Sequence, residues 1–392
     1  MPSPWLRLIA LFASGAVLLA VISGAASLGA AHRVLAALAM PPLVAIVIAA
    51  WLGHRRLLAP ALGALAAFGV AALVTARGLH LAFSALAFAA TLVLTAATYR
   101  GWSGARGSWR DYVTLTKPRI MSLLLLTGLC AMFVGARGAP SAPLVLVTMS
   151  GLALACGGAS ALNHVLDRDI DKLMGKRTRA RPLAAERMPP TYALEFGLAL
   201  SAFSFVLLAS LVNELTAALA LVGNLFYVLV YTRWLKRSTP QNIVIGGAAG
   251  AVPPLVGWAA VTGNLTLPAL WLFLIVFFWT PPHFWALALL IRRDYEAARI
   301  PMLPVVRGVR ETTRQIVLYA LVLVAVTVVP VVWGPLGAGY LVAALALGAA
   351  FVGLALGLRR EATPRRAALL FHYSLLYLAL LFVAMALDPL LA

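Results

Sequence analysis

The chain has 392 residues, of which 63% are hydrophobic and only 11% are charged, and its mean hydropathy is +0.96. This composition excludes a soluble globular domain, because such a domain needs far more polar surface. The net charge of +19 is compatible with binding to nucleic acid or to a membrane surface, so the placement of the basic residues has to decide between them.

Thirteen apolar segments are long enough to form transmembrane helices. Four precede and nine follow the polar segment 101–118, so we expect a four-helix block over 1–100, a linker or interfacial segment over 101–118, and a nine-helix domain over 119–392. We expect the first segment to be an uncleaved helix rather than a signal peptide. The thirteen segments are 5–25, 34–52, 58–76, 80–99, 119–136, 142–164, 191–212, 215–232, 242–261, 268–291, 315–333, 337–358 and 367–387.

The basic residues follow the alternation of these segments. With the N-terminus in the cytoplasm and the C-terminus outside, 28 of the 31 Lys and Arg residues fall on the inner side, and only Arg33, Arg77 and Arg137 fall on the outer side. This distribution is the positive-inside rule, so the charge reflects topology and anionic lipids rather than nucleic acid. The sequence therefore predicts an all-α, multi-pass protein of the cell membrane, and its long, charged inner loops place the active site on the cytoplasmic side.

One motif within an inner loop indicates chemistry. Asn163, Asp167 and Asp171 recur at intervals of four residues, and each interval turns about 40° and rises about 6 Å along a helix, so the three side chains share one face. Such oxygen ligands suit Mg2+, whereas Asp169 points to the opposite side and is expected at the surface. Basic residues from Lys172 to Arg181 follow and can meet phosphate groups. Register alone leaves a solvated charged loop as an equal alternative.

A second motif lies at the end of another apolar segment. Pro281 and Pro282 are expected to kink or break the helix at membrane depth. Asp294 follows where the chain returns to the interface, and its carboxylate is a candidate to complete the metal site. His283 stands between aromatic residues, where a buried, hydrogen-bonded histidine is the commoner interpretation.

Two histidines of the first block, His32 and His80, begin predicted helices at the same depth. Such a pair can ligate a haem iron from opposite sides. Spacing alone favours the alternative that they are polar residues at an interface.

The second block resembles the haem O synthase family, the haem-farnesylating branch of the membrane-embedded prenyltransferases. The resemblance covers about 110–390. Its strings are Asp111-Tyr112, Leu115 to Arg119, Asn163 to Asp171, Arg177-Thr178, Arg181 to Leu183, Tyr231-Thr232, Leu235 to Arg237, Thr239 to Gly247, Val261 to Gly263, Trp279 to Trp285, Asp294-Tyr295 and Ile300 to Pro304. Many relatives in the wider superfamily have a further aspartate four residues after Asp294, where this chain has Ala298.

The resemblance implies a central cavity and transfer of farnesyl from farnesyl diphosphate to a vinyl group of haem B, with addition of water, giving haem O. It implies Mg2+ bound by Asn163, Asp167, Asp171 and Asp294. The expected diphosphate contacts are Lys117, Arg119, Lys172, Arg177, Arg181, Lys236 and Arg237. The candidate haem or substrate pocket comprises Tyr231, His283, Trp279 and Trp285.

Two alternatives remain open: prenylation of another acceptor such as a quinone precursor, and a haem or lipid transporter without catalysis. The expected partners are farnesyl diphosphate, haem B and the lipid bilayer, with haem A synthase or terminal oxidase assembly as candidate partners downstream. The first block is similar, through His32-Arg33 and Leu79-His80, to one half of haem A synthase. That similarity implies haem bound by His32 and His80.

Overall fold

The computed structural model describes residues 4–25, 30–53, 57–73, 107–333 and 336–391, together with residues 80, 83–84, 86–88, 90–91, 94–95 and 98. Within these ranges the chain forms helices and no strand. Ten of the helices are long and apolar enough to cross a membrane, so the chain is an all-α, multi-pass membrane protein. Arg55, Arg56, Leu79 and the start of the predicted linker, 101–106, lie outside the described residues.

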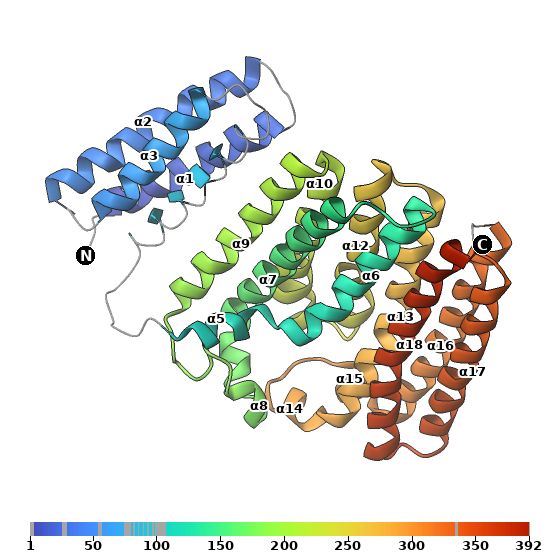
Figure 1. Cartoon of the computed structure of the whole chain (residues 1–392). Helices are drawn as coiled ribbons and strands as arrows, with labels where there is room; N and C mark the ends of the chain where they lie inside the picture. The colour runs from blue at the N-terminus through green and yellow to red at the C-terminus, as the bar shows by residue number, and fades with distance from the viewer. Residues whose placement is uncertain are drawn as a thin grey trace.

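The N-terminal block contains α1 (Pro4–Ala25), α2 (Ala30–Gly53) and α3 (Leu58–Leu73). Buried alanines and leucines form its core, and Val206 from the second block belongs to the same core cluster. The block therefore packs against the second block through an apolar contact (Figure 1). The predicted fourth helix, 80–99, is described only in part, and its described residues are helical.

Nine of the ten candidate spans lie between Pro118 and Asp388, the number that the sequence predicts for the second block. Short helices α5 (Trp109–Thr116), α8 (Lys176–Arg179), α11 (Lys236–Ser238), α14 (Arg292–Ala297) and α15 (Leu303–Val306) join or flank the spans. The spans are built from α6 (Pro118–Ala136), α7 (Ala142–Asp171), α9 (Pro190–Leu211), α10 (Glu214–Leu225) with the π-helical segment η2 (Phe226–Leu235), α12 (Asn242–Thr262), α13 (Leu267–Leu290), α16 (Gly308–Trp333), α17 (Ala338–Arg360) and α18 (Pro364–Leu391).

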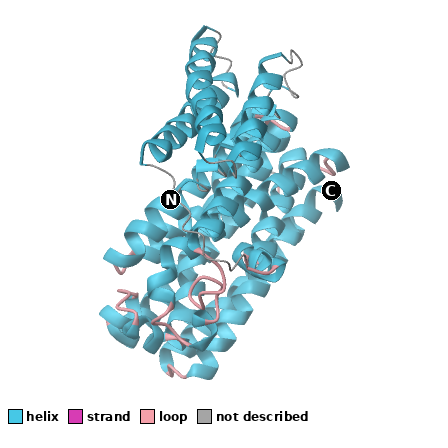
Figure 2. Cartoon of the chain, turned by 90° about the vertical axis from the view of Figure 1, so that its left-hand side faces the viewer, coloured by secondary structure: helices cyan, strands magenta, loops and turns pink. Residues whose placement is uncertain are grey.

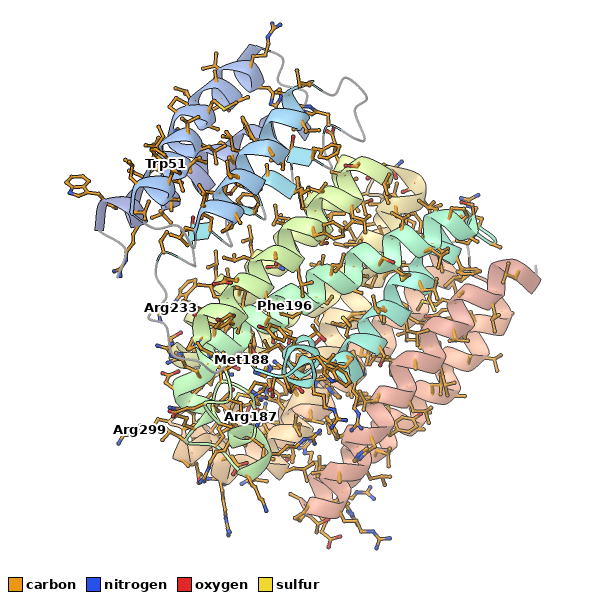
Figure 3. The ribbon with its side chains drawn as sticks, turned by 60° about the vertical axis from the view of Figure 1, so that its left-hand side comes forward. Trp51, Arg187, Met188, Phe196, Arg233 and Arg299 are labelled. Atoms are coloured by element: carbon orange, nitrogen blue, oxygen red, sulfur yellow. The ribbon has the colours of Figure 1, made fainter. Side chains whose placement is uncertain are left out.

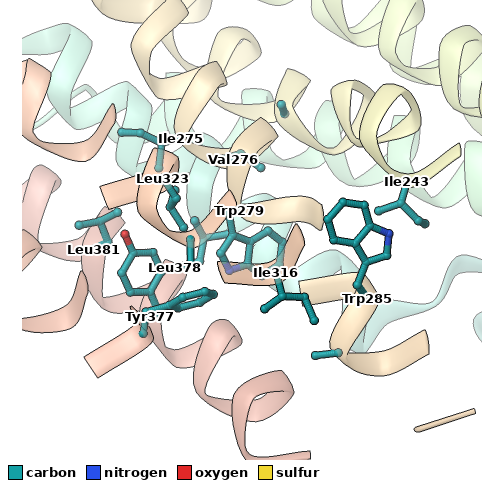
Figure 4. Close-up of a cluster of buried hydrophobic side chains, with 14 of the residues drawn as sticks. Ile243, Ile275, Val276, Trp279, Trp285, Ile316, Leu323, Tyr377, Leu378 and Leu381 are labelled. Atoms are coloured by element: carbon teal, nitrogen blue, oxygen red, sulfur yellow. The ribbon is translucent and has the colours of Figure 1, made fainter. Parts of the chain in front are cut away.

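Helices α12 and α13 are the most buried spans and form the centre of the second block. The first span of the block, α6, packs against both α12 and the last span, α18, so the helices close around this centre. In the described part of the chain, helices joined by short loops make up the whole structure (Figure 2). Trp279 and Trp285 of α13 pack with residues of α12, α16 and α18, including Ile243, Ile316 and Tyr377 (Figure 4). This core holds the helices whose ends carry the polar motifs.

Pro281 and Pro282 do not break their helix, because α13 is helical from Leu267 to Leu290; the kink that the sequence also allows stays a prediction. Each proline removes one backbone donor, but the helix here is buried on several sides, and packing against α12, α16 and α18 holds it. The same tolerance is seen in α12, which contains Pro253 and Pro254.

The described part of the predicted linker contains a helix. Ser108 caps α5: its side chain accepts a hydrogen bond from the backbone N–H of Asp111, and the Asp111 carboxylate accepts from the Ser108 N–H. Leu115 is fully buried, and its carbonyl accepts a 2.6 Å hydrogen bond from the Ser160 hydroxyl of α7. Helix α5 is therefore attached to the second block.

The short helices α8, α14 and α15 gather at one end of the second block (Figure 1). Basic side chains are concentrated there, including the labelled Arg187 and Arg299 (Figure 3). Arg187 donates a 2.8 Å hydrogen bond to Asp111, which ties the segment after α8 to α5. This end of the bundle carries both predicted motifs.

Candidate active site

The last turns of α7 carry the predicted acidic face, and all three of its side chains are buried. Asn163, Asp167 and Asp171 are each at most 2% exposed. This burial excludes the alternative of a solvated charged loop for these three residues. Charged groups are buried only where other groups compensate their lost hydration.

Asn163 connects three parts of the chain. Its Oδ1 accepts a 2.7 Å hydrogen bond from the Lys117 ammonium. Its Nδ2 donates to the Asp167 carboxylate at 2.8 Å and to the Thr232 hydroxyl at 3.0 Å. The amide therefore fixes the distance between the corner before α6, the end of α7 and the π-helical segment η2.

Asp167 is completely buried. Its Oδ2 accepts hydrogen bonds from Asn163 and from the ammonium of Lys236, so its charge is paired with a cation. Its Oδ1 is also buried and has no hydrogen-bond partner among the described residues. A buried carboxylate oxygen without a donor is suited to receive a cation.

Asp171 lies one turn further on and is bound by Arg181, whose Nη1 donates to both carboxylate oxygens at 2.8 and 3.0 Å. Asp294, from the other predicted motif, lies beside the turn between these residues. A Cβ on Gly175 would lie 2.4 Å from the Asp294 Oδ2. The fold thus places the second motif close to the first, as the sequence predicts.

Lys117 forms the corner between α5 and α6 and has left-handed backbone angles, with φ of 49°. Burial lowers the pKa of Lys117 to about 7, and the nearby Arg181 and Lys236 lower it too, while Asp167 and Asp171 act in the opposite direction. Lys117, Lys236 and Arg181 thus surround two buried carboxylates with three basic groups. That excess of basic groups suits an anionic substrate.

Of the remaining predicted phosphate contacts, two have partners outside the acidic face and two are exposed. Lys172 forms an ion pair with Glu186 at the surface. Arg237 donates to both oxygens of Asp169 at 2.7 Å and to the carbonyl of Leu166 at 2.6 Å, so Asp169 lies in the surface position that the sequence predicts. Arg119 and Arg177 are exposed.

Two of the predicted pocket residues, Trp279 and His283, lie in the core between α13 and α18. The Trp279 indole donates to the carbonyl of Ser374 at 2.8 Å, and His283 Nδ1 is 2.7 Å from the Ser374 hydroxyl. The His283 ring stacks on Trp279 with 4.3 Å between ring centres. The contacts described for these residues join them to α18 and not to the acidic face, so His283 has the surroundings of a hydrogen-bonded core histidine.

The other two predicted pocket residues differ in their surroundings. Trp285 is 2% exposed and makes an edge contact with Tyr319. Tyr231 lies in η2, one residue before Thr232, and its ring packs so closely on Gly246 that a Cβ there would lie 2.3 Å from it. Of the four, Tyr231 is thus the one placed next to the network of Asn163.

Two residues of the site were not predicted from the sequence. Thr232 receives a hydrogen bond from Asn163. His164 is 1% exposed, and neither of its ring nitrogens has a hydrogen-bond partner among the described residues. The available signal for His164 was its position directly after Asn163, and for Thr232 its position at the end of a predicted span beside Tyr231.

His32 and His80, the candidate ligands of the N-terminal block, lie in contact. Their ring centres are 5.4 Å apart, and the ring planes are nearly perpendicular, at 82°. The structure thus brings together two residues that are 48 positions apart in the sequence.

The chain was compared with known proteins. The model of the UbiA prenyltransferase family matches residues 124–385. A protein of Roseiflexus sp. (strain RS-1) named protoheme IX farnesyltransferase is 45% identical over 411 residues, covering 94% of this chain and 77% of that protein. A protein of the same name from Symbiobacterium thermophilum is 57% identical over 281 residues, covering 71% of this chain and 94% of that protein.

Solved structures show the same fold. A structure of digeranylgeranylglyceryl phosphate synthase matches with a TM-score of 0.61 at 16% identity, covering 72% of this chain and 99% of that one. A UbiA homologue from Archaeoglobus fulgidus bound to DMAPP and Mg2+ matches with a TM-score of 0.54 at 17% identity, covering 70% of this chain and 99% of that one. With the family match over two thirds of its length, the chain belongs to the UbiA prenyltransferase family.

Proposed function

We propose that this membrane enzyme transfers a farnesyl group from farnesyl diphosphate to a vinyl group of protohaem IX, with addition of water, giving haem O and diphosphate. The observation that carries the proposal is the 45–57% identity to proteins named protoheme IX farnesyltransferase over most of this chain. In the reaction, the allylic C–O bond breaks and a C–C bond to the vinyl carbon forms. Water then supplies a hydroxyl group to the resulting cation and releases a proton.

The acidic face has the properties of a Mg2+ site. The buried Asp167 Oδ1 has no donor among the described residues, and hard oxygen ligands are what Mg2+ prefers. Asn163, Asp167, Asp171 and Asp294 would hold the metal. When bound, Mg2+ would neutralise charge on the departing diphosphate. A UbiA homologue of the same fold has been solved with DMAPP and Mg2+.

The basic groups of the site also neutralise charge on the departing diphosphate. Lys117, Lys236 and Arg181 now donate to Asn163, Asp167 and Asp171, and all three can also donate to phosphate oxygens. Negative charge grows on the diphosphate as the C–O bond breaks, so these donors stabilise the transition state more than the bound substrate.

The proposed orientation follows from the charge distribution. The acidic face at the end of α7 leads directly into α8, and α8 and α14 lie together at one end of the bundle (Figure 1). Basic loops such as those at this end favour the cytoplasmic side. The product, a haem carrying a hydroxyethylfarnesyl group, would then be taken up by a membrane partner that modifies or inserts it, such as haem A synthase or a terminal oxidase under assembly.

The test is direct. Membranes containing the chain are incubated with haem B, farnesyl diphosphate and Mg2+, and the extracted haems are measured by mass. We expect a product heavier than haem B by one farnesyl group plus water. A chelator should abolish it, and excess Mg2+ should restore it. Unchanged haem together with diphosphate release in the presence of a quinone precursor would instead assign a different acceptor.

A further inference from the structure

Both buried carboxylates of the acidic face are already paired with a basic side chain. The Lys236 ammonium donates a hydrogen bond to Asp167. The Arg181 guanidinium donates to both oxygens of Asp171, at 2.8 and 3.0 Å. A carboxylate that is neutralised in this way gains less from a second cation than a free carboxylate does, since the two cations repel each other. A metal ion that binds here must therefore compete with the cations of the protein itself.

The pair of Lys236 and Asp167 has unused hydrogen-bonding capacity on both sides. The Lys236 side chain is 11% exposed and that of Asp167 is fully buried, so solvent screens their charges little. Among the described residues, the ammonium donates to Asp167 Oδ2, although it carries three donors. The other oxygen, Asp167 Oδ1, is buried and has no donor in the same part of the chain. The pair thus offers an acceptor to a metal ion and further donors to an anion.

The backbone holds this pair in register. Helix α7 packs along α10 and η2, and three hydrogen-bonded pairs that join α7 to α10, η2 and α11 are each 69 residues apart in the sequence: Ala155 with Asn224, Asn163 with Thr232, and Asp167 with Lys236. This constant offset means that the two segments run in the same direction and stay level with each other. The helix pair fixes the backbone of Lys236, while its flexible four-carbon side chain allows the ammonium alone to move.

An anion beside the metal would give the ammonium another acceptor. Lys117 donates to Asn163 at 2.7 Å, one turn before Asp167, so a further basic group lies beside the pair. Phosphate oxygens accept hydrogen bonds from ammonium and guanidinium groups. A diphosphate bound here would accept the ammonium that leaves Asp167, and its negative charge would offset the positive charge of the metal.

We propose that Lys236 couples the binding of the metal to the binding of the diphosphate. Lys236 competes with the metal for Asp167, and the diphosphate relieves this competition by accepting the ammonium. Because such coupling is reciprocal, the metal and the diphosphate each raise the affinity of the site for the other by the same factor. The inference rests on the proposed prenyl diphosphate substrate but not on the identity of the prenyl acceptor.

The test measures binding without turnover. The full-length chain is purified in detergent and titrated with Mn2+, which takes the same oxygen ligands as Mg2+, with and without inorganic pyrophosphate. Free Mn2+ is measured by electron paramagnetic resonance. We expect pyrophosphate to lower the Kd of the wild-type chain for Mn2+ by roughly 10-fold or more. In Lys236→Met, the Kd for Mn2+ alone should fall by roughly 10-fold, and the effect of pyrophosphate should shrink by a similar factor.

Arg314→Met is the matched control, because it also removes one positive charge, but from an exposed pair with Glu311 on α16. It should bind Mn2+ as the wild-type chain does, with the same effect of pyrophosphate. Pyrophosphate chelates Mn2+ in solution to the same extent in every sample, so the comparison between variants removes that contribution.

Lys236→Arg addresses the case in which the methionine variant does not fold. Arginine keeps the buried charge pair, and its planar group can donate to both oxygens of a carboxylate, including Asp167 Oδ1. The Kd for Mn2+ alone should therefore rise although the net charge is unchanged.

Three results would each overturn the proposal: an unchanged or raised Kd for Mn2+ alone in Lys236→Met, an unchanged Kd in Lys236→Arg, or a pyrophosphate effect of equal size in the wild-type chain and Lys236→Met. Farnesyl transfer to haem is measured separately by product mass. Haem O formation without the coupling would refute this inference alone, and the coupling without haem O would refute the proposed acceptor alone.

Discussion

Asp167 and Asp169 are two residues apart on α7, and both are paired with a cation, yet their carboxylates are suited to different roles. Asp167 is completely buried, and its Oδ1 has no donor in the described structure. The Asp169 side chain is 60% exposed, and both of its oxygens are occupied by Arg237. Only Asp167 offers an oxygen to a metal or to a substrate-bound cation.

We therefore expect Asp167→Asn to lower kcat for farnesyl transfer by roughly 10²-fold or more, because loss of several kcal/mol of charge stabilisation has this effect. Asp169→Asn is the matched control, with the same chemical change on the outer side of the same helix, and it should stay near the wild-type rate. Equal rates in the two variants, measured by product mass, would remove Asp167 from the reaction.

His164 leads to a prediction in which activity and stability move apart. Its buried ring nitrogens have no partner among the described residues, and such groups lower stability. We expect the ring N–H to donate to the anionic substrate, so His164→Phe should lower kcat/KM for farnesyl diphosphate without lowering the thermal unfolding midpoint. His372→Phe, at an exposed position, is the control. A drop in the unfolding midpoint with unchanged kinetics would indicate a purely structural role.

At the residue scale, the spacing of four residues predicted that Asn163, Asp167 and Asp171 share one face, but it left open whether that face is buried, which the structure shows. The partners of that face could not be predicted in the same way, because Lys117 and Thr232 come from positions 46 and 69 residues away. Composition also could not separate the basic residues that bind the acidic face, such as Arg181, from those that bind surface carboxylates, such as Lys172.

At the element scale, the crossing of α6 and α12 depends on two glycines. A Cβ on Gly257 would lie 2.0 Å from the backbone carbonyl oxygen of Gly128, whereas a Cβ on Gly250, on the same helix, would meet nothing within 4 Å. Gly257→Ala should therefore destabilise the protein by about 1–3 kcal/mol, since backbone has to move. Gly250→Ala should be neutral or slightly stabilising, and thermal unfolding in detergent measures both.

A substitution in the turn after α7 should disturb the fold less than one at the crossing of α6 and α12. A Cβ on Gly175 would collide with the carboxylate end of Asp294, which can rotate away at little cost to the fold. We expect Gly175→Ala to leave the unfolding midpoint unchanged and to raise the Mg2+ concentration needed for half-maximal transfer, because Asp294 is displaced. Unchanged Mg2+ dependence would show that the position of Asp294 does not affect the metal.

Apolar length predicted the nine spans of the second block, but local details escaped it. The predicted segment 215–232 continues as η2 and α11 to Ser238, and the extra turns deliver Lys236 to Asp167. Hydropathy cannot register a π-helical segment, since that depends on backbone hydrogen bonding. Hydropathy did not predict α5 within the linker, because the eight residues of this helix are too few and too polar to form a transmembrane span.

At the scale of the whole molecule, we expect the second block to be sufficient for farnesyl transfer and the first block not to be required for it. The match to the relative from Symbiobacterium thermophilum covers 94% of that protein but only 71% of this chain, so the other 29% of this chain has no counterpart in the match. We expect a chain beginning at Gly107 to keep farnesyl transfer, measured by product mass. Loss of transfer in a truncated protein shown to be folded would mean that the first block takes part in the reaction.

The apolar contact between the blocks has a consequence for how this enzyme responds to its surroundings. Val206 and Phe205 of α9 meet the N-terminal core, and in a bilayer the same side chains would be equally well covered by acyl chains, which provide no net hydrophobic drive for association. Lipids therefore compete with the first block for this surface of α9. The covalent link between the two blocks gives the first block a high local concentration, which favours its binding over that of lipids. The association of the first block with α9 should therefore weaken in detergents that form thin micelles or solvate apolar surfaces strongly, while each block stays folded.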